Sequence, residues 1–152
     1  MGIKIIAKNR KAFHEYEITD RLEAGIELQG TEVKSMRQGK VNLGDGWVAI
    51  DDQGEAYLKQ VHISHYSHGN IYNHDEGRPR KLLLKKQEIK KLSEQVERKG
   101  FALVPLKAYF KGQFIKIEIG VGKGKKAHDK RDSSKEKDAQ REIERALKRS
   151  RT

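Results

Sequence analysis

The stretch that decides the fold is residues 22–40, LEAGIELQGTEVKSMRQGK, because a strand pattern changes to a helical one within it. Apolar residues at 22, 24, 26 and 28 alternate with polar or small ones, which is typical of a strand with one buried face and one face in water. The alternation extends back to Tyr16, and only Asp20 breaks it. We therefore predict one long strand over residues 16–28, or two strands joined by a bend near Thr19. Strands of this length usually curl into a barrel or pack on a helix.

A short basic helix is expected directly after this strand. Thr31 is a candidate N-cap, since its hydroxyl can accept a hydrogen bond from a free backbone amide. Lys34 and Arg37 share one face of the helix. Gly39 is a candidate C-cap, because glycine adopts the left-handed conformation that ends many helices.

Two hairpins account for much of the remaining apolar sequence. In the first, strands at 47–50 and 56–63 flank a loop at 51–54. Three residues of its second strand are predicted to face one side, namely Tyr57, Val61 and Ile63. The second hairpin covers residues 101–121 and turns at 111–113, because even-numbered positions are apolar on its first arm and odd-numbered positions on its second.

The clearest helical pattern covers residues 81–99. Ile89, Leu92 and Val96 form an apolar stripe, which Leu82 or Leu83 extends backward, and Gly100 follows as the residue that ends the helix. Residues 64–80, before this helix, have little apolar periodicity and are expected to form a long loop.

Histidines gather in and beside this loop, at positions 62, 65, 68 and 74. Their spacing matches no helical pair of metal ligands, and the chain contains no cysteine to join them. We therefore expect neither a metal site nor a cofactor.

The last fifth of the chain differs from the rest. The apolar pattern is expected to stop at Gly120, where Gly120, Gly122 and Gly124 loosen the junction. Residues 123–152 contain twelve Lys and Arg against six Asp and Glu. A thin apolar stripe at helical spacing follows, formed by Ala139, Ile143, Ala146 and Leu147. This segment is too polar to form a stable helix alone, so we predict a domain at 1–122 and a tail at 123–152 that is disordered when free and helical when bound.

Composition favours a polyanion as the partner. The 152 residues include 33 basic and 22 acidic ones, a formal net charge of +11, and a small basic protein most often binds nucleic acid. Absence of cysteine excludes disulfides, thiolate zinc sites and a cysteine nucleophile. The sequence lacks a membrane-length apolar run and the apolar core of a signal peptide, so we expect a cytoplasmic protein.

Binding explains more of the sequence than catalysis does. No nucleotide-binding loop, HExxH motif or serine nucleophile elbow is present, although the strand carboxylates Glu15, Glu17, Glu23 and Glu27 keep a metal-dependent nuclease open as an alternative. The basic side chains expected to approach RNA phosphates are Arg10, Lys11, His14, Lys34, Arg37 and Lys116. His14 and Tyr16 can also stack on bases, but the shared parity of Tyr16 and Ile18 favours a core position for Tyr16.

Several stretches are more specific than a basic composition. They read NRKA at 9–12, HEY at 14–16, EAG at 23–25, QGTEVKSMR at 29–37, GK at 39–40, RKLLL at 80–84, IGVGKGKK at 119–126 and HDKR at 128–131. Together and in this order, they closely resemble the small protein B (SmpB) family, the bacterial partners of transfer-messenger RNA. We take RKLLL to open the helix at 81–99.

This resemblance implies a mainly β fold with helices (α+β), an antiparallel OB-like β barrel with flanking helices and a basic C-terminal tail. It also implies a non-catalytic adaptor that binds the tRNA-like domain of transfer-messenger RNA and delivers it to stalled ribosomes for trans-translation. The tail then occupies the empty mRNA channel near the decoding centre, and elongation factor Tu joins through the RNA. We expect the protein to act as a monomer.

The resemblance also assigns roles to individual residues. Glu23, Leu83 and Lys116 match family residues linked to RNA binding, and His14 matches the HEY segment near the RNA. The tail residues expected at the decoding centre are Gly124, Lys125, Lys126, His128, Asp129, Lys130 and Arg131. Ile143 and Leu147 are expected on the apolar side of the tail helix. The remaining alternative is a small ribosomal or ribosome-assembly protein with a basic extension.

Overall fold

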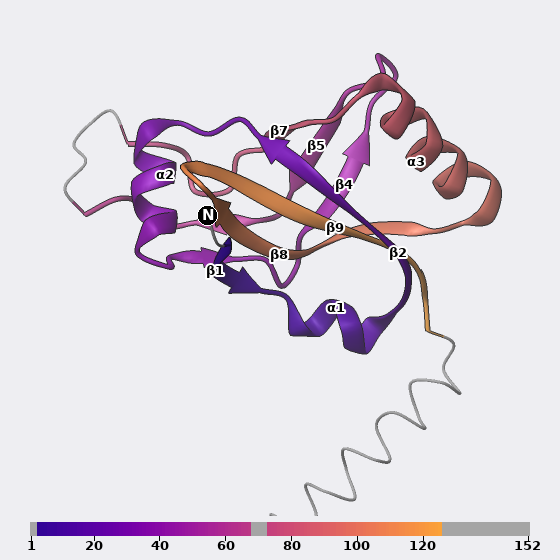
Figure 1. The fold of residues 1–152 in the computed structure, drawn as a ribbon, viewed down its shortest axis with the longest axis horizontal. Coiled ribbons are helices and arrows are strands. Elements are labelled where there is room, and N and C mark those ends of the chain that lie inside the picture. The colour runs from indigo at the N-terminus through magenta and orange to yellow at the C-terminus, as the bar shows by residue number, and fades with distance from the viewer. Residues whose placement is uncertain (1–2, 68–72, 126–152) are drawn as a thin grey trace, which may run out of the picture.

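Most of the chain forms one curled antiparallel sheet with three helices around it (Figure 1). A computed structural model describes residues 3–67 and 73–125. The strands of the main sheet follow the order β1-β8-β9-β2-β7-β5-β4, and β3 and β6 form a second, small sheet. The edge strand β4 packs against β8, so the main sheet bends back on itself. This partly closed, mainly β arrangement confirms the predicted OB-like α+β fold.

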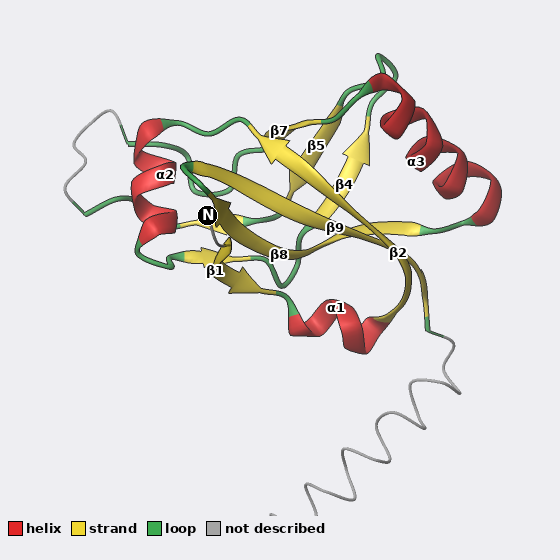
Figure 2. Ribbon diagram, in the orientation of Figure 1, coloured by secondary structure: helices red, strands yellow, loops and turns green. Residues whose placement is uncertain are grey.

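The elements have the following bounds, and Figure 2 distinguishes helices from strands. The strands are β1 (Ile3–Lys8), β2 (Tyr16–Ile26), β3 (Val41–Asn42), β4 (Trp47–Ile50), β5 (Ala56–Lys59), β6 (His62–Ile63), β7 (Arg80–Leu83), β8 (Ala102–Lys111) and β9 (Phe114–Gly124). The helices are α1 (Arg10–Glu15), α2 (Gly30–Arg37) and α3 (Lys86–Lys99). No helix in these described ranges is long and apolar enough to cross a membrane.

The long strand β2 is the centre of the sheet, between β9 and β7. Its pairing with β9 shifts by one residue between Ile18 and Asp20, which leaves Thr19 as a bulge. The Thr19 hydroxyl donates a hydrogen bond to the Val121 carbonyl, 3.1 Å away. Of the two alternatives, the single long strand is therefore confirmed, with a bulge at the position of the predicted bend, although it ends at Ile26 and not at residue 28. Tyr16 and Ile18 pack on a small apolar cluster with Ala12 of α1.

Helix α2 begins earlier than predicted. Its N-cap is Gln29, so the assignment of Thr31 as the cap was wrong. The backbone amide of Gln29 donates a hydrogen bond to the Glu32 carboxylate at 2.7 Å, as part of a capping box. The Thr31 hydroxyl instead lies 2.9 Å from Nδ1 of His74. The C-cap is Gln38, one residue before the predicted Gly39. Gly39 follows it with a φ of +74°, the left-handed conformation that is common just after a helix.

Two other boundary predictions were wrong because a strand was divided or missed. The strand predicted at 56–63 breaks at Gln60, which has a φ of +58°. The break changes which parity faces the core, so Ala56 and Leu58 are buried before it and Val61 and Ile63 after it. Tyr57 therefore does not share the buried side.

The start of the predicted helix at 81–99 is also a strand. Arg80 and Leu82 are buried and alternate with more exposed neighbours, the period of a strand, and β7 pairs with both β5 and β2. Helix α3 begins only at Lys86 and ends at Gly100, whose φ is +67°. Pairing with two neighbouring strands thus overrides the helical preference of RKLLL.

The glycines near the end of β9 do not loosen the chain, contrary to the sequence prediction. A Cβ atom at Gly120 would lie 2.8 Å from the Leu106 side chain, and one at Gly122 would lie 2.3 Å from the Glu17 carbonyl oxygen. Both positions therefore need glycine for close packing between strands. Strand β9 continues to Gly124, opposite Tyr16.

Candidate nucleic-acid interface

Glu23, Leu83 and Lys116 come together on the outer face of the sheet. In the central strand β2, Gly25 lies opposite Lys116 of β9 on one side and Leu83 of β7 on the other. Glu23 is two residues before Gly25, so its side chain points to the same face. A Cβ at position 25 would lie 3.2 Å from the Leu83 Cβ, so glycine leaves room for the exposed Leu83 side chain.

Two residues that the sequence analysis did not select hold Glu23 in place. The Tyr109 hydroxyl of β8 donates a hydrogen bond to Oε2 of Glu23, and Nζ of Lys111 lies 3.3 Å from Oε1. Tyr109 is only 3% exposed and lies opposite Lys116. We call Glu23, Leu83, Tyr109, Lys111 and Lys116 the outer patch.

The charge state of Glu23 follows from these contacts. The hydrogen bond from Tyr109 lowers the pKa of the Glu23 carboxyl, and Lys111 adds to this effect against a smaller opposing effect of burial. Burial and the neighbouring Glu23 carboxylate raise the pKa of the Tyr109 hydroxyl. Glu23 is therefore an oriented carboxylate that can accept hydrogen bonds from a base or a 2′-hydroxyl, while Lys111 and Lys116 supply positive charge for phosphates.

A signal for the missed residues was present in the sequence. The even-numbered positions of the strand that ends at Lys111 were assigned to the core, which places the odd-numbered Lys107, Tyr109 and Lys111 on the opposite face with Glu23. Parity therefore selects these residues, although it does not reveal which of them contacts Glu23.

A second group of predicted residues lies on and after α1. Asn9 is buried and fixes the start of this helix. Its side-chain nitrogen donates a hydrogen bond to the Pro105 carbonyl at 2.8 Å, and its side-chain oxygen accepts one from the Ala12 backbone amide at 3.2 Å. Arg10 is exposed, Lys11 pairs with the exposed Asp45 at 2.8 Å, and His14 is half-buried. Tyr16 belongs partly to the apolar cluster below α1.

The predicted residues of α2 form a third group. Nζ of Lys34 lies 5.5 Å from the centre of the Tyr66 ring, and Cζ of Arg37 lies 5.4 Å from that of Phe110. Phe110 and Tyr109 are consecutive in β8, so their side chains point to opposite faces of the sheet. Arg37 therefore lies off the outer patch, and the predicted RNA contacts occupy more than one surface.

A buried ion pair connects α2 to β7. Arg80 and Glu32 are both fully buried, with 2.7 Å between Nε of Arg80 and Oε2 of Glu32. Arg78 binds the same carboxylate, and Nη1 of Arg80 also donates to the Val61 carbonyl at 2.6 Å. These contacts fix β7, the strand that ends at Leu83. Arg80 of the family-like RKLLL stretch therefore has a structural role.

Histidine and carboxylate side chains do not form a metal centre in the part of the chain that the structure describes. His74 is buried, and its ring nitrogens contact the Thr31 hydroxyl and the Ile63 carbonyl, the latter at 2.8 Å. Glu23 is occupied by Tyr109 and Lys111. These contacts give the histidine and the strand carboxylate structural partners.

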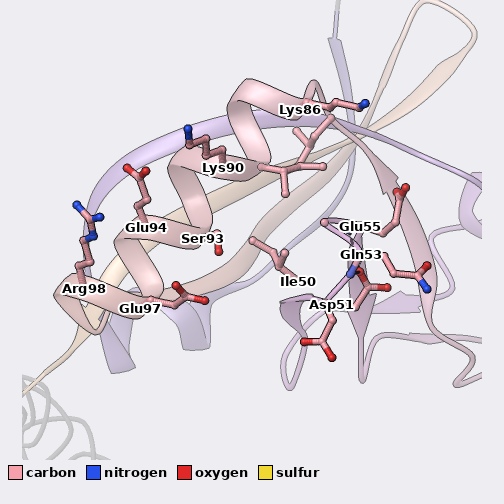
Figure 3. Close-up of a pocket in the computed structure, with 14 residues that line it drawn as sticks. Ile50, Asp51, Gln53, Glu55, Lys86, Lys90, Ser93, Glu94, Glu97 and Arg98 are labelled. Atoms are coloured by element: carbon pink, nitrogen blue, oxygen red, sulfur yellow. Dashed lines mark hydrogen bonds between the residues drawn. The ribbon is translucent and has the colours of Figure 1, made fainter.

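A separate groove of about 940 Å³ lies between α3 and the loop that joins β4 to β5 (Figure 3). Its walls carry charges of both signs: Asp51, Asp52 and Glu55 lie on the loop, and Lys86, Lys90, Glu94, Glu97 and Arg98 lie on α3. None of the predicted RNA-binding residues lines this groove. Its mixed charge does not favour a polyanion.

Part of the predicted tail lies beyond the described ranges. These residues are Lys126, His128, Asp129, Lys130, Arg131, Ile143 and Leu147. Gly124 and Lys125 are described, and the Lys125 amide donates to the Glu15 carbonyl at 2.9 Å.

Known proteins resemble this chain over almost its whole length. The family model described as SmpB protein matches residues 6–149. The SsrA-binding protein of Carboxydothermus hydrogenoformans is 56% identical over 144 residues, which cover 95% of this chain and 96% of that protein. The SsrA-binding protein of Microcystis aeruginosa is 58% identical over 148 residues, with 97% and 96% covered. A chain in the solved structure "tmRNA-SmpB: a journey to the center of the bacterial ribosome" is 45% identical, has a TM-score of 0.69, and matches over 84% of this chain and 93% of its own length. The chain therefore belongs to the SmpB protein family.

Proposed function

We propose that this protein is a non-catalytic RNA-binding adaptor that binds the tRNA-like domain of transfer-messenger RNA and delivers it to stalled ribosomes for trans-translation. The observation that carries this proposal is the outer patch, where three strands bring Glu23, Leu83 and Lys116 together. A curved antiparallel sheet that exposes oriented polar, apolar and cationic groups suits a structured RNA with unpaired bases. The relatives named SsrA-binding protein and the tmRNA-SmpB structure on the bacterial ribosome support the same partners.

The two parts of the chain have different roles in this proposal. Residues 1–122 recognise the RNA, and the basic segment 123–152 enters the empty mRNA channel near the decoding centre. Elongation factor Tu joins the complex through the RNA. The protein acts as a monomer in the cytoplasm. The matches give no support to the alternative of a small ribosomal or assembly protein.

Competition binding tests the proposal. The full-length protein is expected to prefer the tRNA-like fragment of transfer-messenger RNA to an unrelated hairpin of equal length. Glu23→Ala and Lys116→Ala should each weaken binding about tenfold, because each removes a charged group that RNA contacts. Only Lys116→Ala should reduce the slope of log affinity against log salt concentration, by about one, because it alone removes a cation that meets a phosphate.

Lys90→Ala is the matched control, since Lys90 is an exposed lysine on α3 in the groove away from the outer patch. It removes the same charge and should leave the preference unchanged. An equal loss in Lys90→Ala, or no preference of the wild-type protein for the tRNA-like fragment, would indicate a generic polyanion binder and contradict the proposal.

A further inference from the structure

An exposed aromatic ring on the basic surface has no role in the core. Helix α1 buries Ala12, whereas the next residue, Phe13, remains 43% exposed. Cζ of Arg21 in β2 lies 5.3 Å from the centre of the Phe13 ring. The pair therefore combines a planar cation and an aromatic ring at the surface, the two groups on which unpaired bases stack in RNA-binding proteins.

The surroundings of this pair are cationic. A groove of about 220 Å³ lies beside Phe13 and Arg21, and its charged lining also includes Lys8, Arg10, Lys107 and Glu118. Four of these side chains are basic and one is acidic. Oε1 of Glu118 lies 3.4 Å from Nη1 of Arg21, and Oε2 lies 3.7 Å from Nζ of Lys107. The single carboxylate thus holds two of the cations in place and leaves the groove with net positive charge.

The groove adjoins the outer patch. Arg21 and Glu23 are two residues apart in β2 and share one face, which places their Cα atoms about 7 Å apart. Glu118 of β9 lies opposite Glu23, and it also pairs with Lys107 of β8. A nucleic-acid strand on the outer patch can therefore continue into the groove without leaving the sheet.

We infer that the Phe13–Arg21 pair is a base-stacking platform that extends the outer patch and takes an unpaired nucleobase of the bound RNA. The base stacks on the exposed surface of the pair, and its flanking phosphates meet Lys8, Arg10 and Lys107. This inference rests on the proposed function, because it assigns a further contact to the same RNA. The outer patch and the positive charge of the groove favour RNA as the occupant.

Two substitutions at one position test the platform with the tRNA-like fragment. Phe13→Leu keeps an apolar side chain but removes the ring, so it should weaken binding about tenfold while the slope of affinity against salt stays unchanged. Phe13→Tyr keeps the ring and should retain wild-type affinity. Arg10→Ala should instead lower the slope by about one ion, because it removes a phosphate contact. Thermal melts of all variants should agree with the wild-type melt, since these side chains are exposed.

The outcomes separate the platform from the proposed function. If Glu23→Ala weakens binding and Phe13→Leu does not, the platform is refuted and the adaptor proposal stands. Equal losses in Phe13→Leu and Phe13→Tyr would also refute it, because stacking would then not be the cause. If the wild-type protein shows no preference for the tRNA-like fragment over the hairpin, the proposed function itself fails.

Discussion

A chain that ends at Lys125 should bind the tRNA-like fragment with nearly wild-type affinity but lose ribosome rescue completely. The outer patch and the Phe13–Arg21 platform both precede this point. The segment removed holds the motif that the family resemblance assigns to the decoding centre, except Gly124 and Lys125, and a basic chain suits a channel walled by RNA. The measurement pairs the binding assay with peptide tagging on ribosomes stalled at the end of a truncated message.

The structure determines where this cut must be made. Lys123 and Gly124 still pair with β2, and the amide of Lys125 donates to Glu15. A cut after Gly122, the predicted domain boundary, would therefore also remove sheet contacts. A full-length protein in which residues 126–152 are scrambled keeps the charge and is the matched control, expected to lose rescue too. Loss of RNA affinity in the chain that ends at Lys125 would contradict the division of roles, which stays a prediction.

Replacing Arg80 with methionine should destabilise the fold by about 3–5 kcal/mol, the usual effect of removing one member of a buried ion pair. Glu32 would keep Arg78 but lose its fully buried partner, and the Val61 and Glu76 carbonyls would lose a donor. Urea denaturation measures the change in the free energy of unfolding.

Lys81→Met provides the control for this substitution on the same strand. Lys81 forms a solvent-exposed pair with Glu55 at 3.3 Å, and such pairs contribute little to stability. Its unfolding free energy should therefore change by less than about 1 kcal/mol. Similar losses of unfolding free energy in Arg80→Met and Lys81→Met would show that the buried pair contributes no more to stability than the exposed one.

Acid should reveal the same ion pair in the wild-type protein. Burial alone raises the pKa of Glu32, but hydrogen bonds from Arg78, the Gln29 amide and Arg80 outweigh it, so the pKa lies below its ordinary value. Stability from a group with a lowered folded pKa is present above its unfolded pKa and is lost as the pH falls through the folded one. Glu32→Gln should be less stable at pH 7 but lose less stability between about pH 5 and pH 3. An unchanged acid slope in Glu32→Gln would contradict this assignment.

Regular alternation made several elements predictable. The strands with a clear period of two, including β2 and the hairpin of β8 and β9, were found because burial of one face imposes that period. Strand β7 was missed because its four residues favour a helix when read alone, and only its pairing with β5 and β2 makes it a strand. The break at Gln60 carries no local signal, since a left-handed glutamine is not expected from its residue type.

The candidate site was harder to predict from residues alone. Glu23, Leu83 and Lys116 are far apart in sequence, and only the strand order β9-β2-β7 brings them together. Family resemblance supplied them before the structure placed them on one face. Glu32 and Arg80 entered the sequence analysis only as members of two family-like stretches, because a sequence pattern shows no sign of a buried pair whose members are 48 residues apart.

In the proposed function, strand β9 lies between the two binding regions of the chain. Lys116 lies in the outer patch, and Gly124, the last residue of the strand, is eight positions further along. At the rise of an antiparallel strand this separation is about 27 Å. A Cβ at Gly122 would lie 2.3 Å from the Glu17 carbonyl oxygen, so β9 and β2 approach closely along this part of the strand. If the outer patch and the tail have the proposed roles, the length of β9 sets the distance between the bound RNA and the point where the tail begins.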